Sequence, residues 1–275
     1  MNQTSERSPT PSKNRTGWWL LLAAFIVTLA VYWPGLSGGF LFDDYPNIVD
    51  NPGVQPSNAS FSSLVGAALS SPSSEFKRPL ASLSFAANYL ISGLDPYWMK
   101  LTNLVIHLLN GLLVFLLSRS LLRITMTGAG KRAGVIAALI TTGWMLLPIN
   151  LTGVLYVVQR MESMANLFVL LGLLGYVAGR RQMMGVRSDV DGTSPPLGAS
   201  WASGMRSFVL CVASLVACTG MGALAKETAV MLPLYAVLIE WVVFRFRRPT
   251  GQQDNRVTAL FVAVLLLPLL AGLVW

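Results

Sequence analysis

Residues 98–118 read WMKLTNLVIHLLNGLLVFLLS, an apolar run broken by only a few polar side chains. Because an α-helix rises about 1.5 Å per residue, about 20 apolar residues cross the hydrocarbon core of a bilayer. Six further runs of this kind lie at 17–36, 133–150, 163–179, 207–224, 228–244 and 257–275. The sequence therefore predicts an all-α polytopic membrane protein with about seven spans over residues 17–275, preceded by a tail at 1–16.

The composition agrees with a membrane protein. Of the 275 residues, 53% are hydrophobic and 12% are charged, against roughly 25% charged in soluble domains. The mean hydropathy of +0.58 excludes a water-soluble globule. Cys211 and Cys218 would lie about 10 Å apart along one helix, so no disulfide between them is expected.

The basic residues predict the orientation. With the tail in the cytoplasm, most of them fall in cytoplasmic segments, as the positive-inside rule requires. These are Arg7, Lys13, Arg15, Arg119, Arg123, Lys131, Arg132, Arg180, Arg181, Arg187, Arg206, Arg245, Arg247, Arg248 and Arg256. The net charge of +8 therefore reflects topology, and no nucleic-acid partner is expected. We predict a multi-pass protein of the bacterial inner membrane whose first run is an uncleaved signal anchor.

The longest outward segment, residues 37–97, is predicted to be periplasmic and structured. Helical periodicity follows Ser60, with apolar residues at Phe61, Leu64, Val65, Ala68 and Leu69. A second helix is expected from Pro79, since proline is favoured at the first position of a helix. Both helices are expected to lie in the membrane interface.

Two adjacent carboxylates, Asp43 and Asp44, follow the first run directly. Like charges this close raise the pKa of at least one of them, which suits a general base. The alternative is an Asx-turn before Tyr45 and Pro46.

The outward side carries few cations, and each could bind an anionic lipid headgroup. Lys77 and Arg78 lie in the long segment, Arg160 lies beside Glu162, and Lys226 is followed by Glu227. The alternative is snorkelling or local ion pairing at helix ends.

Asn103, His107 and Asn110 lie on one face of the 98–118 run. This stripe favours hydrogen bonding between helices, with a supporting role at a site as the alternative. Since His107 is the only histidine, no zinc site is predicted.

Four segments, taken together, resemble the GT-C membrane glycosyltransferases. They are FLFDDYPNIVDNPGV at 40–54, KRPLASLSFAANYLISGLDPYWMKLTNLVIHLLNGLLVFLL at 77–117, LPINLTGVLYVVQRMESMANLFVLL at 147–171 and AKETAVMLPLYAVLIEW at 225–241. The likeness is greatest to the transmembrane and tetratricopeptide-repeat O-mannosyltransferases and their bacterial relatives. It covers residues 17 to about 245.

The resemblance implies a GT-C-like helical bundle that moves a sugar from a polyprenyl-phosphate-linked donor to a Ser or Thr hydroxyl of an exported protein, such as a pilin. It implies Asp43 as the base with Asp44 positioning it; the opposite assignment stays open. By the same likeness, the donor phosphate would contact Arg78, Arg160 and Lys226. Supporting roles would fall to Lys77, Glu162, Glu227, Asn103 and His107. No dedicated metal site is expected, although the two acids could bind a divalent cation.

The chain also departs from the family pattern. Tetratricopeptide repeats are absent, and the sequence ends within an apolar run. We therefore expect either a truncated form or a site completed by a partner subunit or an oligomer. Alternative functions are the same chemistry on a lipid or glycan acceptor, and a non-catalytic polyprenyl-lipid transporter or assembly scaffold.

Overall fold

The structure, a computed structural model, describes residues 15–126, 128, 130–185 and 201–274. Its regular elements are all helices, and these ranges contain no strand. Five helical segments are long and apolar enough to cross a membrane: Thr16–Ser37, Pro96–Thr125, Val157–Met183, Gly204–Ala223 and Glu227–Phe244. The predicted all-α polytopic class is confirmed.

The other two apolar runs are also helical. The run 133–150 contains most of α5 (Gly130–Met145), which has 16 residues, and the run 257–275 falls largely within α10 (Asn255–Val274). The total of seven spans and the orientation stay predictions. Residues 1–14 of the expected tail lie outside the described residues.

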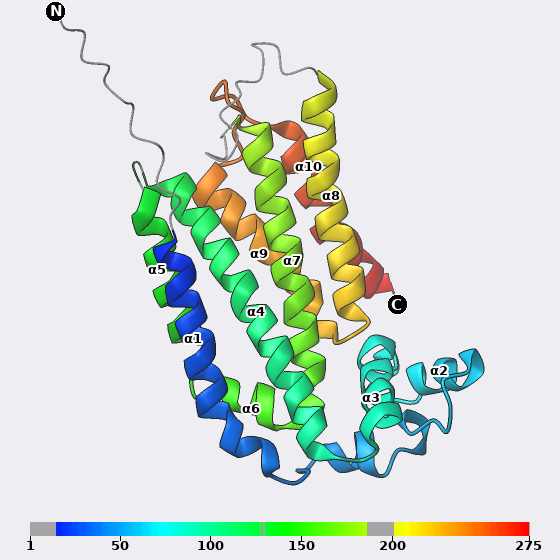
Figure 1. The fold of residues 1–275 in the computed structure, drawn as a ribbon. Coiled ribbons are helices and arrows are strands. Elements are labelled where there is room, and N and C mark those ends of the chain that lie inside the picture. The colour runs from blue at the N-terminus through cyan, green and yellow to red at the C-terminus, as the bar shows by residue number, and fades with distance from the viewer. Residues whose placement is uncertain (1–14, 127, 129, 186–200, 275) are drawn as a thin grey trace, which may run out of the picture.

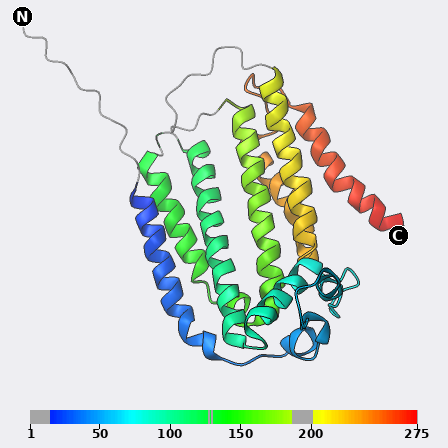
Figure 2. The same cartoon turned by 45° about the vertical axis from the view of Figure 1, so that its right-hand side comes forward.

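The long helices run side by side in both views (Figures 1 and 2). The helices α1 (Thr16–Tyr32), α4 (Pro96–Thr125) and α5 pack together, while α7 (Arg160–Met183) joins α4 to α8 (Trp201–Ala223). The short α9 (Leu232–Ile239) and α10 complete the bundle. We call the end that carries α2 (Phe61–Ala68) and α3 (Pro79–Ser92) the loop end, and the opposite end, where α1 begins, the Arg15 end.

Local sequence explains the helices at the loop end. Ser60 caps α2, because its hydroxyl accepts a hydrogen bond from Ser63 N at 3.3 Å. Pro79 occupies the first position of α3. Asp95 caps α4 by accepting from Tyr97 N at 2.9 Å. The two helices predicted within residues 37–97 are confirmed; their position relative to a membrane stays a prediction.

A hydrophobic core lies beneath the long segment 37–97. Ile48 and Phe85, from this segment, pack with Met99 of α4 and Val157. A larger core, which includes Tyr176, fills the space between α7, α8, α9 and α10. The loop end is therefore packed onto α4 and α7, and this packing gives its polar residues fixed positions.

Apolar side chains of the predicted spans also face outward. Trp19 is 65% exposed and Val242 is 68% exposed, as suits helices surrounded by hydrocarbon. Cys211 and Cys218 are both free thiols, as predicted.

Candidate active site

The adjacent acids Asp43 and Asp44 lie at the loop end, but their environments differ. Asp43 is exposed, whereas Asp44 is fully buried. Asp44 Oδ2 accepts a hydrogen bond from Leu41 N at 3.0 Å, and its Oδ1 accepts from Val158 N at 2.7 Å. Since Val158 lies in the short helical turn Val157–Gln159 that leads into α7, Asp44 joins the acidic turn to the bundle. Neither amide lies two residues after Asp44, as an Asx-turn would require, and Asp43 is the acid that faces outward.

Lys100 supports the same turn from α4. It is buried, and its Nζ donates to Gly38 O at 2.6 Å and Gly39 O at 3.0 Å. Burial raises the pKa of Asp44 above its usual value, while hydrogen bonds from backbone amides and the charge of Lys100 offset part of that rise. Lys100 was not among the predicted site residues. Lys100 is a lone charge within an apolar run, and such a charge in a predicted membrane helix indicates a functional position.

Main-chain contacts hold Asp43 and leave its carboxylate outward. Asp43 N donates to the Tyr156 hydroxyl at 2.7 Å, and Asn47 Nδ2 donates to Asp43 O at 2.8 Å. Phe42, the preceding residue, has a left-handed backbone with φ of 36° and an 81% exposed side chain. A bulky residue in this region is strained, and such strain is concentrated at functional sites.

The hydroxyl of Tyr156 contacts this turn directly, through the backbone amide of Asp43. Burial raises the pKa of Tyr156, and the nearby charges of Asp43 and Asp44 add to the rise. The phenol therefore keeps its proton and can donate one hydrogen bond while it accepts another from Asp43 N. Neither Tyr156 nor Asn47 was singled out in the sequence.

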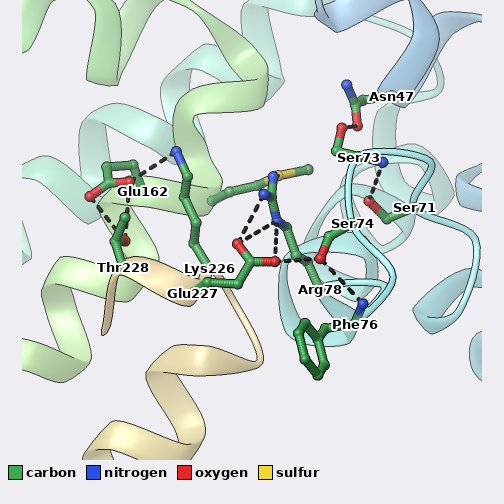
Figure 3. A network of polar contacts seen from close by, with 11 residues as sticks. Asn47, Ser71, Ser73, Ser74, Phe76, Arg78, Glu162, Lys226, Glu227 and Thr228 are labelled. Atoms are coloured by element: carbon green, nitrogen blue, oxygen red, sulfur yellow. Dashed lines mark hydrogen bonds and ion pairs between the residues drawn. The ribbon is translucent and has the colours of Figure 1, made fainter. Parts of the chain in front are cut away.

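A second group of polar residues, which we call the outer network, joins the long segment to the end of α8 and the start of α7 (Figure 3). Its members are Ser74, Arg78, Glu162, Lys226, Glu227 and Thr228. Arg78 pairs with Glu227 through Nε at 3.2 and 3.1 Å and through its terminal nitrogen at 2.9 Å. Ser74 donates to the same carboxylate. This is the bidentate geometry that makes arginine–carboxylate pairs specific.

Lys226 and Glu227 are neighbours in sequence but pair in different directions. Lys226 Nζ lies 3.0 Å from Glu162 Oε2, and Thr228 Oγ1 donates to both oxygens of Glu162 at 3.2 Å. The side chain of Lys226 is 25% exposed, and that of Arg78 is 16% exposed. The predicted alternative of local ion pairing therefore describes both cations in this structure.

The backbone of the outer network is strained beside these pairs. Lys77 and Arg78 both have left-handed conformations, with φ of 60° and 42°, directly before Pro79. Leu80 N then donates to Leu224 O at 3.0 Å, which joins α3 to the end of α8. Lys77 is exposed.

Hydrogen bonds connect the acidic turn to the outer network. Asn47, which donates to Asp43 O, also contacts Ser73 Oγ through its side-chain oxygen. The next residue, Ser74, contacts Glu227. Figure 3 shows this path from Asn47 through the serines to Glu227. These contacts link the backbone of Asp43 to Glu227, the partner of Arg78, and we call this group, together with Lys226, the polar surface of the loop end.

Arg160 does not belong to that surface. It is fully buried, with Nε donating to Asn103 Oδ1 at 2.7 Å and its terminal nitrogens donating to Ser84 O at 3.0 Å and Met99 O at 2.8 Å. Its guanidinium also lies 4.7 Å from the centre of the Phe85 ring. These partners occupy its donors and give Arg160 a structural role, so we leave it out of the proposed phosphate-binding set.

The polar stripe on α4 makes the contacts expected of hydrogen bonding between helices. Asn103 Nδ2 donates to Val154 O at 3.2 Å and to two neighbouring carbonyls. His107 Nε2 lies 3.0 Å from Met145 O, and its ring stacks on Trp144 at 5.2 Å between centres. Both side chains are buried away from the polar surface. Within the described residues, no three His, Cys, Asp or Glu gather as a metal site would require.

The curated proteins that the chain matches share one activity in their names. It is 33% identical over 159 residues to Protein O-mannosyl-transferase TMTC3 of Mus musculus, which covers 56% of this chain and 16% of that protein. It is 30% identical over 234 residues to Protein O-mannosyl-transferase Tmtc1 of Drosophila melanogaster, covering 83% of this chain and 23% of the relative. Protein O-mannosyl-transferase TMTC4 of Homo sapiens is 29% identical over 185 residues, covering 62% of the chain and 25% of that protein.

The chain spans less than a third of the length of these relatives. No family model matches it, and no solved structure does. The resemblance found in the four sequence segments is nevertheless confirmed, because the curated homologues of this chain are the TMTC protein O-mannosyl-transferases, at 24–33% identity.

Proposed function

We propose that this chain is a glycosyltransferase that moves a sugar from a polyprenyl-phosphate-linked donor to a Ser or Thr hydroxyl of a protein. The observation that carries the proposal is the contrast between the two acids: Asp43 is exposed, while Asp44 is buried and bound by two backbone amides. A base must reach its substrate, so Asp43 is the base and Asp44 positions it.

The reaction needs one proton acceptor and one leaving group. Asp43 takes the proton from the acceptor hydroxyl as the hydroxyl oxygen attacks the anomeric carbon of the donor sugar. The bond from that carbon to the phosphate oxygen breaks, and the phosphate leaves with the electron pair. Because the leaving group is already an anion, it needs charge stabilisation rather than an acid.

We propose that three cations of the loop end stabilise this phosphate. Lys77 is exposed, and Arg78 and Lys226 keep part of their surface despite their carboxylate partners. A phosphate would share Arg78 with Glu227 and Lys226 with Glu162. Five donors on a planar fork let one guanidinium bind two anions, which makes Arg78 the strongest of the three candidates.

The names of the relatives suggest mannose as the first sugar to test and a protein as the first acceptor. An exported protein, such as a pilin, is the acceptor class that fits the predicted periplasmic side of a bacterial inner membrane. The distribution of basic residues supports this orientation. A Ser57→Cys variant in intact cells should react with a membrane-impermeant maleimide; protection of that cysteine would contradict the orientation.

The test is sugar transfer by the full chain in lipid nanodiscs. Radiolabelled polyprenyl-phosphate mannose and a Ser/Thr-rich peptide are supplied, and label on the peptide is measured. Asp43→Asn should lower transfer by about 10²–10⁴-fold, the contribution of a general base. Asp50→Asn, which removes another exposed acid of the same segment, is the matched control and should stay within about twofold of the parent.

Two outcomes would contradict the proposal. Full activity of Asp43→Asn beside an active parent would remove Asp43 as the base. Flipping of the labelled lipid across the bilayer without a new glycosidic bond on peptide, lipid or glycan would instead support a transporter.

A further inference from the structure

The Arg15 end carries a group of arginines that no carboxylate pairs with in the part of the chain that the structure describes. Arg119, near the end of α4, forms no ion pair there, and its Nε is buried without a hydrogen-bond partner. Arg123 lies one helical turn further along α4. The carboxylates of Glu240 and Asp254 are held instead by Arg180 and Arg248. Positive charge is therefore uncompensated on this side of α4.

An aromatic surface adjoins Arg119. Its guanidinium carbon lies 5.6 Å from the centre of the Trp18 ring and 6.0 Å from that of Phe115. The Trp18 ring in turn meets Phe115 edge to face at 5.0 Å. A cation on an aromatic face is held in place by the ring, while N–H donors at the edge of the guanidinium can still bind an anion in the plane of the guanidinium.

Trp18 also lines an open hollow on α1. The other lining residues are Arg15, Trp19 and Leu22, and the hollow has a volume of about 350 Å³. Arg15 lies at the start of α1, and Leu22 lies about 10 Å further along the helix axis. The lining changes in that direction from a cation, through two indoles, to an aliphatic side chain.

This order matches the parts of a membrane lipid: phosphate, glycerol and acyl chain. Tryptophan and arginine are typical of the level at which headgroups meet hydrocarbon. We propose that the hollow between Arg15 and Leu22, together with Arg119, binds an anionic phospholipid of the bilayer, with the phosphate between Arg15 and Arg119. The site lies at the opposite end from Asp43, so it is separate from the site of sugar transfer and does not depend on it.

Native mass spectrometry of the purified full chain tests this site. The protein in detergent is offered equal amounts of phosphatidylglycerol and phosphatidylcholine, and bound copies of each are counted. Phosphatidylglycerol should dominate on the parent. Arg119→Gln should lower its occupancy by about fivefold, the factor for one basic residue at an anionic surface.

Arg206→Gln is the matched control. Arg206 is an exposed arginine of α8, which lies across the bundle from α1 in Figures 1 and 2, and its loss should leave the occupancy unchanged. If Arg119→Gln elutes as aggregate, Arg15→Gln, at an exposed position, gives the same comparison. Equal binding of the two lipids, or equal losses from the Arg119 and Arg206 variants, would overturn the proposal. Displacement of the lipid by the same concentration of glycerol phosphate would show that the site recognises phosphate alone, which would also overturn it.

Discussion

Because Asp43 is exposed and Asp44 is buried, replacing each by Asn should affect different properties: Asp44→Asn should mainly lower stability, and Asp43→Asn should mainly lower sugar transfer. In Asp44→Asn the side chain keeps one oxygen acceptor, while its NH2 group faces a backbone N–H that the carboxylate had bound, at Leu41 or Val158. A hydrogen bond to a charged group is worth about 1.5–3 kcal/mol, and the buried amide loses its partner. We therefore expect Asp44→Asn to lower the free energy of unfolding by about 3 kcal/mol.

Thermal unfolding of the protein in nanodiscs measures this difference. At about 2–4 °C per kcal/mol for a chain of this size, Asp44→Asn should lower Tm by about 6–12 °C. Asp43→Asn removes an exposed carboxylate and should change stability by no more than about 0.5 kcal/mol, or about 2 °C. In the transfer assay, after correction for the amount of folded protein, Asp43→Asn should lose more activity than Asp44→Asn. Equal Tm shifts, or the larger shift for Asp43→Asn, would refute the assignment of Asp44 as the structural acid.

Three further measurements test other parts of the structure. Because burial raises the folded-state pKa of Asp44, the proton-linked part of its contribution to stability is present below the unfolded pKa of about 4 and is lost as pH rises through the folded pKa, while its hydrogen bonds with Leu41 and Val158 remain. The Tm difference between the parent and Asp44→Asn should thus shrink as pH rises from about 4; a growing difference would contradict the pKa direction. Arg160→Met removes three hydrogen bonds of a buried guanidinium, leaves Asn103 Oδ1 without this donor and should cost about 3–5 kcal/mol, seen as a fall in Tm or in folded yield; a loss of transfer with an unchanged Tm would argue against its structural role. Gly179→Ala places a methyl 2.5 Å from Cys211 Sγ and should destabilise by about 1–3 kcal/mol, whereas Gly220→Ala, with open space around it, should be neutral or stabilising in the same Tm measurement.

The sequence could predict what depends on neighbours along the chain. The apolar runs became helices, and the loop-end helices begin at Ser60 and Pro79, where local capping chemistry places them. Local sequence does not show which of the two adjacent aspartates, Asp43 or Asp44, is buried. Asp44 is buried because Val158 N lies 114 residues away in sequence but 2.7 Å away in space.

The burial of Arg160 could not be predicted for a similar reason. Its position at the edge of an apolar run predicted a cation at the membrane rim, but Asn103, Ser84 and Met99 converge on it from α3 and α4. Lys100 could have been found, since it is a lone charge within the apolar run 98–118. Its partners, Gly38 O and Gly39 O, could not, because glycine carbonyls carry no sequence signal.

The pairing of Arg78 with Glu227 sets an order of events during synthesis. The two residues are 149 positions apart, so at about 5–20 residues per second a ribosome reaches Glu227 roughly 7–30 s after Arg78. Throughout that interval Arg78 lacks its carboxylate partner, and for most of it α3 lacks its backbone contact to Leu224. The junction of α3 with residues 224–227 therefore forms late, and a nascent chain released before residue 227 would present an incomplete polar network to quality-control proteases.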